Sequence, residues 1–188
     1  MIAVSKKRAT YQDLVDLPEN VIGEILDGEL HAQPRPAVPH ASSSSNLGGL
    51  LHGPFRFGRG GPGGWVILDE PELHLGAEPD VLVPDLAGWR RERMPETPGT
   101  PAISLAPDWI CEVLSPSTAK IDRVKKLPIY AREAVGHAWL VDPIARTLEV
   151  YRHDAGRWVL IAAFADEVVV RAEPFDAIEL ELGLLFSS

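Results

Sequence analysis

The most informative stretch of this sequence reads Trp109-Ile110-Cys111-Glu112-Val113-Leu114-Ser115. It is an apolar run of strand length with one carboxylate in its middle. A similar run, Val81-Leu82-Val83-Pro84-Asp85-Leu86-Ala87, carries Asp85. A carboxylate among apolar neighbours is costly unless it pairs with a charge or binds a metal. We therefore expect Asp85 and Glu112 on neighbouring buried strands with a cation between them, because two close carboxylates otherwise repel each other.

The residues that follow Glu112 supply further polar groups. A Ser/Pro/Thr turn over 115–118 precedes a helical pattern in which Asp122, Lys126 and Tyr130 stand four positions apart. This spacing puts the three side chains on one helix face. Carboxylate oxygens are ligands that Mg²⁺ or Mn²⁺ prefers. A lysine beside two metal-bound carboxylates can steady an attacking water or a scissile phosphate, so Lys126 would complete such a site.

The remaining sequence predicts alternating helices and strands. The first half indicates a short helix capped by Thr10 and ended by Pro18, followed by a hairpin over 21–30 that turns at Asp27-Gly28. An extended connection over 33–39, a poor helix over 40–51 and a glycine loop over 58–64 come next. Strands are predicted over 65–68, 72–75, 81–87, 109–114, 138–141, 148–151, 158–164 and 167–170. Apolar spacing predicts a helix over 119–135, which Pro128 should kink or split.

Length and composition set the broad class. The chain has 188 residues, which suits a single domain over 1–188. Its net charge of −9 argues against a generic DNA-coating surface but leaves room for a nucleic-acid enzyme whose positive charge is local. Cys111 is the only cysteine, which excludes an internal disulfide and a multi-cysteine zinc cluster.

The distribution of apolar residues bears on location. The longest apolar runs are of strand length and fall short of the roughly 18 to 20 residues that cross a bilayer. The first ten residues hold charges but no apolar stretch of signal-peptide length. We therefore expect a cytoplasmic protein with no membrane partner.

Five segments, in order along residues 11–151, carry a family resemblance. They are 24–30, 83–87, 112–118, the helical pattern with Asp122, Lys126 and Tyr130, and 138–143. Together they resemble the Uma family of putative restriction endonucleases, a branch of the PD-(D/E)XK nucleases. The most specific part is the Glu-Val-Leu-Ser-Pro-Ser-Thr stretch with Trp-Leu-Val-Asp-Pro downstream.

The resemblance implies an α/β, restriction-endonuclease-like PD-(D/E)XK fold, with a central mixed β-sheet flanked by helices. It also implies metal-dependent hydrolysis of DNA phosphodiester bonds. One or two Mg²⁺ or Mn²⁺ ions would be held by Asp85, Glu112 and the backbone carbonyl of Val113, with Glu24 as a further acidic group. The site lysine would be Lys126 on the following helix, since Leu114 stands where the common pattern has it. By analogy with this fold, we expect a homodimer.

Several of these residues have a second interpretation. Asp80 is a rival to Asp85, and Glu24 and Lys126 also fit solvated surface residues. His40 fits a helix cap or a surface residue better than a catalytic base. The basic residues at 90–93 and 120–126 fit either a phosphate-facing rim or plain surface. For the whole protein, the alternatives are an inactive binding or scaffold domain, or a nuclease acting on RNA or branched DNA.

Overall fold

Two large β-sheets hold most of the strands, and the computed structural model describes them over residues 8–187. The five-stranded sheet has the order β2 (Glu29–Pro34), β1 (Val21–Leu26), β5 (Asp80–Leu82), β4 (Glu72–Leu75) and β7 (Ala102–Ile103). The six-stranded sheet has the order β11 (Arg157–Ala165), β10 (Thr147–Asp154), β9 (His137–Asp142), β8 (Trp109–Val113), β6 (Leu86–Arg90) and β3 (Trp65–Asp69). A small third sheet pairs β12 (Val169–Val170) with β13 (Leu180–Glu181). Both large sheets are mixed, because β4–β7 and β8–β9 are parallel pairs.

The helical segments are short apart from one. They are α1 (Tyr11–Val15), α2 (Val38–Leu51) with a π-helical turn η1 (His52–Arg56), α3 (Ala119–Ile121), a π-helical turn η2 (Asp122–Lys126), α4 (Leu127–Arg132) and a 3-10 helix η3 (Leu182–Phe186). Within residues 8–187, no helix combines the length and apolar character needed to cross a bilayer. Most of the stretch 1–10, on which the expectation of no signal peptide rests, lies outside the described residues.

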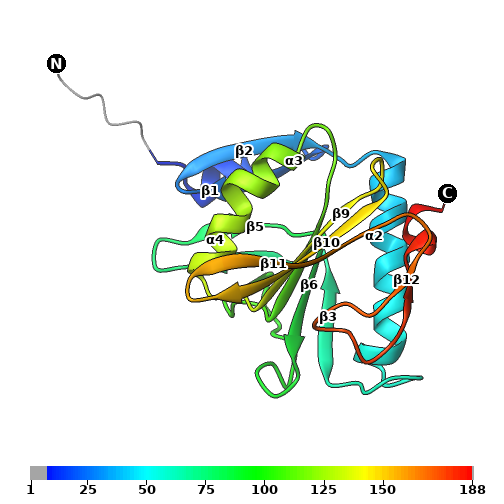
Figure 1. Cartoon of the computed structure of the whole chain (residues 1–188). Helices are drawn as coiled ribbons and strands as arrows, with labels where there is room; N and C mark the ends of the chain where they lie inside the picture. The colour runs from blue at the N-terminus through cyan, green and yellow to red at the C-terminus, as the bar shows by residue number, and fades with distance from the viewer. Residues whose placement is uncertain (1–7, 188) are drawn as a thin grey trace.

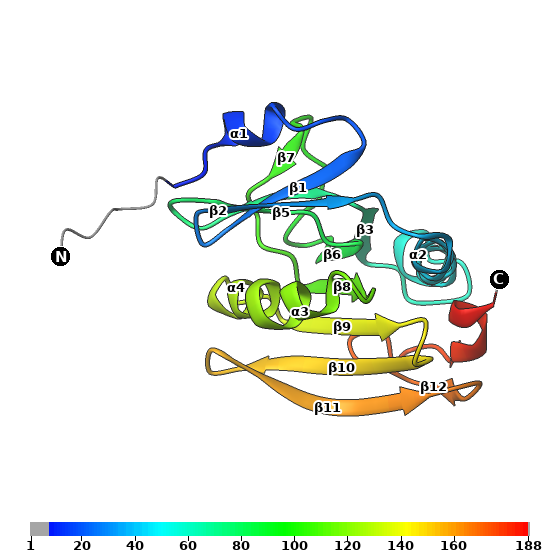
Figure 2. The same ribbon diagram turned by 90° about the horizontal axis from the view of Figure 1, so that it is seen from above.

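The six-stranded sheet is covered by helices on both faces, as Figures 1 and 2 show. Residues of β8 alternate between these faces, since successive strand side chains point in opposite directions. Trp109, Cys111 and Val113 pack in the core beneath α2, whereas Ile110 packs in the core beneath α4. Glu112 therefore points to the α4 side. The expected mixed α/β fold with a central sheet between helices is confirmed, and the five-stranded sheet adds a second layer beside it.

The prediction of one continuous strand over 81–87 is wrong. Two strands of different sheets occupy this stretch, and Asp85 lies between them. β5 ends at Leu82 and β6 begins at Leu86, so the chain leaves one sheet and joins the other within three residues. Pro84 lies in this crossing and has no N–H to continue a ladder of hydrogen bonds. Asp85 thus lies at the junction of the two sheets rather than inside a strand.

The helix expected over 119–135 forms, but with a wider turn before Pro128. The segments α3, η2 and α4 follow one another directly over 119–132. The proline ring would clash with the preceding turn of a regular helix, and the wider turn η2 avoids this clash. The buried face matches the predicted apolar stripe at Leu127 and Ala131 but not at Val124. Val124 is 60% exposed, while Asp122 and Lys126 are 3% and 2% exposed.

Several boundaries differ from the sequence prediction. α2 begins at Val38 and includes Pro39, which the first turn of a helix tolerates because its N–H would have no partner there. The extended connection is correspondingly shorter, since β2 continues to Pro34. The strand expected over 167–170 is limited to Val169–Val170. The capped helix α1, with its Thr10–Asp13 capping box, and the hairpin turning at Asp27-Gly28 are confirmed.

The C-terminal segment closes the core on the α2 side. Phe175 lies 4.6 Å from Phe55, 4.8 Å from Trp65 and 4.8 Å from Trp109, measured between ring centroids. Its side chain is fully buried, and η3 lies alongside α2 in both views (Figures 1 and 2). A segment distant in sequence therefore supplies the central ring of the aromatic core.

We predict that Phe175→Ala lowers the free energy of unfolding by about 3 to 5 kcal/mol, because it leaves a cavity among rings that cannot collapse to fill it. Urea unfolding followed by tryptophan fluorescence measures this loss. Phe57→Ala is the control, since Phe57 is 61% exposed and its removal should change stability by about 0.5 kcal/mol at most. Equal effects of the two substitutions would contradict the central role of Phe175.

Candidate active site

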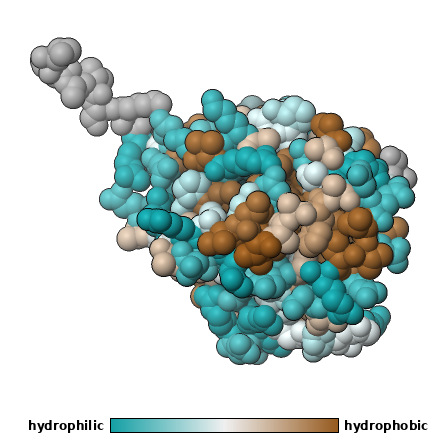
Figure 3. Space-filling model, viewed as in Figure 1, coloured by the Kyte–Doolittle hydropathy of each residue, from teal (hydrophilic) through white to brown (hydrophobic). Residues whose placement is uncertain are grey.

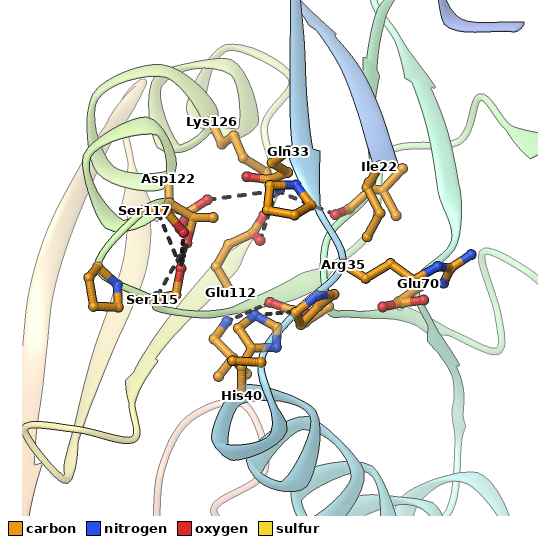
Figure 4. A pocket seen from close by; sticks show the side chains of 18 residues that line it. Ile22, Gln33, Arg35, His40, Glu70, Glu112, Ser115, Ser117, Asp122 and Lys126 are labelled. Atoms are coloured by element: carbon orange, nitrogen blue, oxygen red, sulfur yellow. Dashed lines mark hydrogen bonds and ion pairs between the residues drawn. The ribbon is translucent and has the colours of Figure 1, made fainter. Parts of the chain in front are cut away.

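A cavity of about 290 Å³ opens where the two large sheets, the start of α2 and the helical segment after β8 meet. Figure 4 shows the residues that line it. Glu112 comes from β8, Asp85 comes from the segment that crosses between the sheets, and Asp122 and Lys126 come from η2. The other charged or ionisable residues of the lining are Arg35, His40 and Glu70. The cavity therefore has an acidic wall with few cations.

Two of the carboxylates predicted for the site, Glu24 and Glu112, meet at Lys126. Its Nζ lies 2.8 Å from Glu112 Oε2, 2.9 Å from Glu24 Oε1 and 3.8 Å from Asp122 Oδ1. Glu24 comes from β1, whose hairpin folds over this helical segment, and its Oε1 also accepts the N–H of Val83. Each of these side chains is at most 4% exposed. Lys126 is therefore the cation that lies between Glu24 and Glu112, and not a solvated helix lysine.

Asp85 is held on the other side of the cavity lining. Its Oδ2 accepts the N–H of Val113 at 2.7 Å, and its Oδ1 lies 3.2 Å from His40 Nε2. His40 comes from the first turn of α2 and is 8% exposed. The structure thus brings Asp85, Val113 and Glu112 to one cavity, and Val113 is linked to Asp85 through its N–H. That the Val113 carbonyl binds a metal stays a prediction.

The pKa directions indicate an excess of negative charge at this site. Burial raises the pKa of Glu112 well above its ordinary value, and although Lys126 opposes this, Asp122, Asp85 and Glu24 add to it. Burial likewise raises the pKa of Asp122 to about 6. Burial by itself would lower the pKa of Lys126, but the surrounding carboxylates outweigh it and the pKa is raised. One ammonium is thus not enough to balance the carboxylates around it.

These donors fit a hard divalent cation in their chemistry. Asp122 Oδ2 is buried without a hydrogen-bond partner, and it belongs to a set of carboxylate oxygens that also includes Asp85 and Glu112. Oxygen-rich, negatively charged sets of this kind suit Mg²⁺ or Mn²⁺. In the part of the chain that the structure describes, however, no three acidic, histidine or cysteine side chains are grouped so as to hold a metal ion. Lys126 and Tyr130 engage the two oxygens of Glu112 instead.

Three residues of this cluster were outside the predicted site. Tyr130 donates its hydroxyl to Glu112 Oε1 at 2.7 Å, and Asp122 lies beside Lys126. The sequence did indicate that Asp122 and Tyr130 share a helix face with Lys126, and this was the signal that could have included them in the site. The sequence favoured a cap or surface role for His40, and only the packing of α2 against Asp85 brings it to the cavity. The rival Asp80 is away from the cavity lining, and it is held by the N–H of Asp27 and by the Arg132 guanidinium.

Most of the basic residues at 90–93 and 120–126 contact the protein itself. The Arg90 guanidinium lies 4.1 Å from the centroid of the Trp65 ring. Arg93 pairs with Asp108 at 2.6 Å and Arg123 pairs with Glu149 at 2.8 Å. Because these contacts occupy the charges, the two clusters give weak support to a phosphate-facing rim.

Comparisons with known proteins add an independent finding. The model of the Uma2 family, described as "Putative restriction endonuclease", matches residues 9–184. The fold is similar to that of a crystal structure from Anabaena variabilis ATCC 29413, titled as a putative nuclease belonging to DUF820. The TM-score is 0.75 at 22% identity, and the match covers 95% of this chain and 97% of the other. A comparison with curated proteins found no match.

We predict that metal-free protein loses stability as the pH rises from about 4 to 6. The folded state keeps the Asp122 proton up to about pH 6, whereas the unfolded chain releases it near pH 3.8, so the folded state is progressively disfavoured across this window. The Asp122→Asn variant lacks this contribution, and its stability relative to wild type should rise by about 3 kcal/mol over the window.

Urea unfolding at several pH values in EDTA measures this difference. The control is Asp154→Asn, which changes an exposed carboxylate at the end of β10 and should keep the wild-type profile. Parallel profiles for Asp122→Asn and wild type would show that Asp122 does not keep its proton in the folded state.

Proposed function

This chain belongs to the Uma2 family, and we propose that it is a metal-dependent endonuclease that hydrolyses phosphodiester bonds of DNA. The observation that carries the proposal is the buried Lys126 ammonium, held by Glu24 and Glu112 at the wall of an acidic cavity. A buried ammonium and carboxylates in a cavity are the groups that bind and polarise a phosphate, a cation and a water.

Each residue of the cluster has a proposed role. Asp85, Glu112 and the backbone carbonyl of Val113 would hold one or two Mg²⁺ or Mn²⁺ ions. When bound, such a cation lowers the pKa of a water and neutralises charge that develops on the phosphate. Lys126 would direct its ammonium to the attacking water or to the scissile phosphate, because Nζ can exchange one carboxylate partner for either.

Three further side chains would position these groups. Glu24 and Asp122 flank the Lys126 ammonium, and we assign Glu24 to that ammonium rather than to the cation. Tyr130 fixes the orientation of Glu112 through its hydroxyl. His40 fixes Asp85 in the same way from α2. Buried partners of this kind hold catalytic groups within the narrow geometry that phosphoryl chemistry requires.

One observation favours a second candidate function. Lys126 already bridges Glu24 and Glu112, so the cluster has an internal cation when no metal is bound. A binding or scaffold domain that keeps the fold without catalysis would be stable in this form. Metal binding and cleavage therefore have to be measured together.

We predict that wild-type protein nicks supercoiled plasmid DNA with Mn²⁺ or Mg²⁺, and that Glu112→Gln and Asp85→Asn each lower the rate by roughly 100-fold or more, since each removes a charged ligand of the cation. Gel electrophoresis of the plasmid gives the rate, and calorimetric titration with Mn²⁺ gives the affinity of each variant for the metal. Both variants should bind Mn²⁺ more weakly than wild type.

Lys125→Ala is the matched control, since Lys125 neighbours Lys126 but its side chain is 37% exposed and its Nζ lies 3.8 Å from Glu29. It should keep the wild-type rate and affinity. Equal nicking by wild type and Glu112→Gln would refute the proposed site. No nicking and no Mn²⁺ binding by wild type would favour the scaffold function. Parallel assays with RNA and branched DNA distinguish the other substrates.

We also propose a cytoplasmic homodimer that pairs through β11. This strand is the edge of the six-stranded sheet and is nine residues long, and its residues 158–165 are all uncharged. Val159 and Leu160 are 42% and 52% exposed, and hydrophobic residues gather over this strand in Figure 3. An edge strand with a long uncharged, apolar stretch favours pairing with another strand. Antiparallel pairing of two copies would leave their cavities separate.

We predict that wild type has the mass of a dimer in size-exclusion chromatography with light scattering, and that Leu160→Lys shifts it to a monomer, because a charge opposes pairing at an edge. Val15→Lys is the control, since Val15 is 60% exposed on α1, away from β11. A monomeric wild type at all concentrations would overturn the pairing.

A further inference from the structure

An anionic substrate that enters this cavity needs a cation that the protein does not already use. Glu70, Asp85, Glu112 and Asp122 all line the cavity, so it repels phosphate on its own. Lys126 is bound to Glu24 and Glu112, and His40 is bound to Asp85. Arg35 is the remaining basic residue of the lining.

Arg35 is available for an external partner. Its side chain is exposed, and among residues 8–187 it has no hydrogen bond, ion pair or ring contact with the protein. Figure 4 places it with Glu70 on the side of the cavity opposite Ser115, Ser117 and Asp122. Glu70 is thus the acidic residue that would compete for Arg35, but the two form no ion pair within 4.0 Å.

The backbone holds Arg35 at the cavity mouth. The residue lies in the short connection between β2 and α2, between Pro34 and Pro36. Each proline fixes its own φ, and Pro36 also restricts Arg35 to an extended conformation. The connection therefore presents the arginine from a stiff segment, which limits the conformational entropy that binding removes.

We propose that Arg35 binds a backbone phosphate of the nucleic acid at the mouth of the cavity, and so holds the strand against the acidic wall. The guanidinium group has a planar fork of N–H donors that matches two phosphate oxygens. Arg35 is a substrate-binding residue in this scheme, and the carboxylate cluster carries out the chemistry. The inference rests on the proposed nuclease function for its choice of ligand.

The test measures DNA binding separately from cleavage. All variants are made in a Glu112→Gln background, so that a fluorescein-labelled DNA duplex stays intact in the presence of Mg²⁺, and fluorescence anisotropy is recorded over a range of salt concentrations. Arg35→Ala should weaken binding roughly tenfold, as loss of a charged hydrogen bond implies, and should lower the slope of log affinity against log salt by about one. Arg35→Lys should restore most of the slope, because it keeps the charge.

Arg59→Ala is the matched control, since Arg59 is an exposed arginine in the loop after η1, outside both the cavity lining and β11. It should leave affinity and slope unchanged. If Arg35→Ala behaves like Arg59→Ala, or if the parent protein binds no duplex at all, the inference is overturned.

The same variants separate this inference from the proposed function. In the protein with Glu112 intact, Arg35→Ala should raise KM for plasmid nicking more than it lowers kcat, because Arg35 binds the substrate away from the reacting atoms. Unchanged KM with normal nicking would overturn the role of Arg35 and leave the nuclease proposal standing. Arg35-dependent binding without any nicking by wild type would support the phosphate site and refute the nuclease.

Discussion

The structure depends on one buried ammonium. Lys126 joins β1, β8 and the π-helical turn η2 through Glu24, Glu112 and its own neighbour Asp122. Removing an ammonium and several carboxylates from water is costly, and only close mutual contacts offset that cost. These contacts fix the two large sheets and the helical segment after β8 to each other at one point. The cavity lies at this point, where residues of both sheets and of η2 line it.

The helical segment after β8 shows how local backbone geometry serves this contact. Pro128 disfavours a regular helix through residues 122–126, and the chain forms a wide turn there. Such turns change the direction in which side chains project and are frequent at functional sites. Lys126 and Asp122 consequently point inward, while Val124 remains exposed. The face that packs against the sheet therefore carries the polar pair Asp122 and Lys126 as well as the buried Leu127 and Ile129.

The sequence predicted the groups of the site better than their arrangement. Asp85 and Glu112 could be found because a carboxylate inside an apolar run requires a partner, and Lys126 could be found from its spacing to Asp122 and from the family resemblance. The crossing at Pro84 was missed, since a run of apolar residues does not show where a strand changes sheet. The contact between His40 and Asp85 depends on how α2 packs, and helix packing has no local signature. Phe175 was missed as well, since it lies in an irregular segment between β12 and β13 whose packing has no local signature either.

The imbalance of charge connects the fold to the chemistry. Lys126 satisfies Glu112 and Glu24, but burial and the neighbouring carboxylates still raise the pKa values of Glu112 and Asp122. A bound divalent cation would offset the excess negative charge of the carboxylates. Glu112 could then pair with the cation, and Lys126 would lose one of its two close carboxylate partners. The same cation would reverse the repulsion between the cavity and a phosphate. A bound metal would thus strengthen the binding of a phosphate, and an acidic protein with a net charge of −9 could bind a polyanion locally, at this cavity.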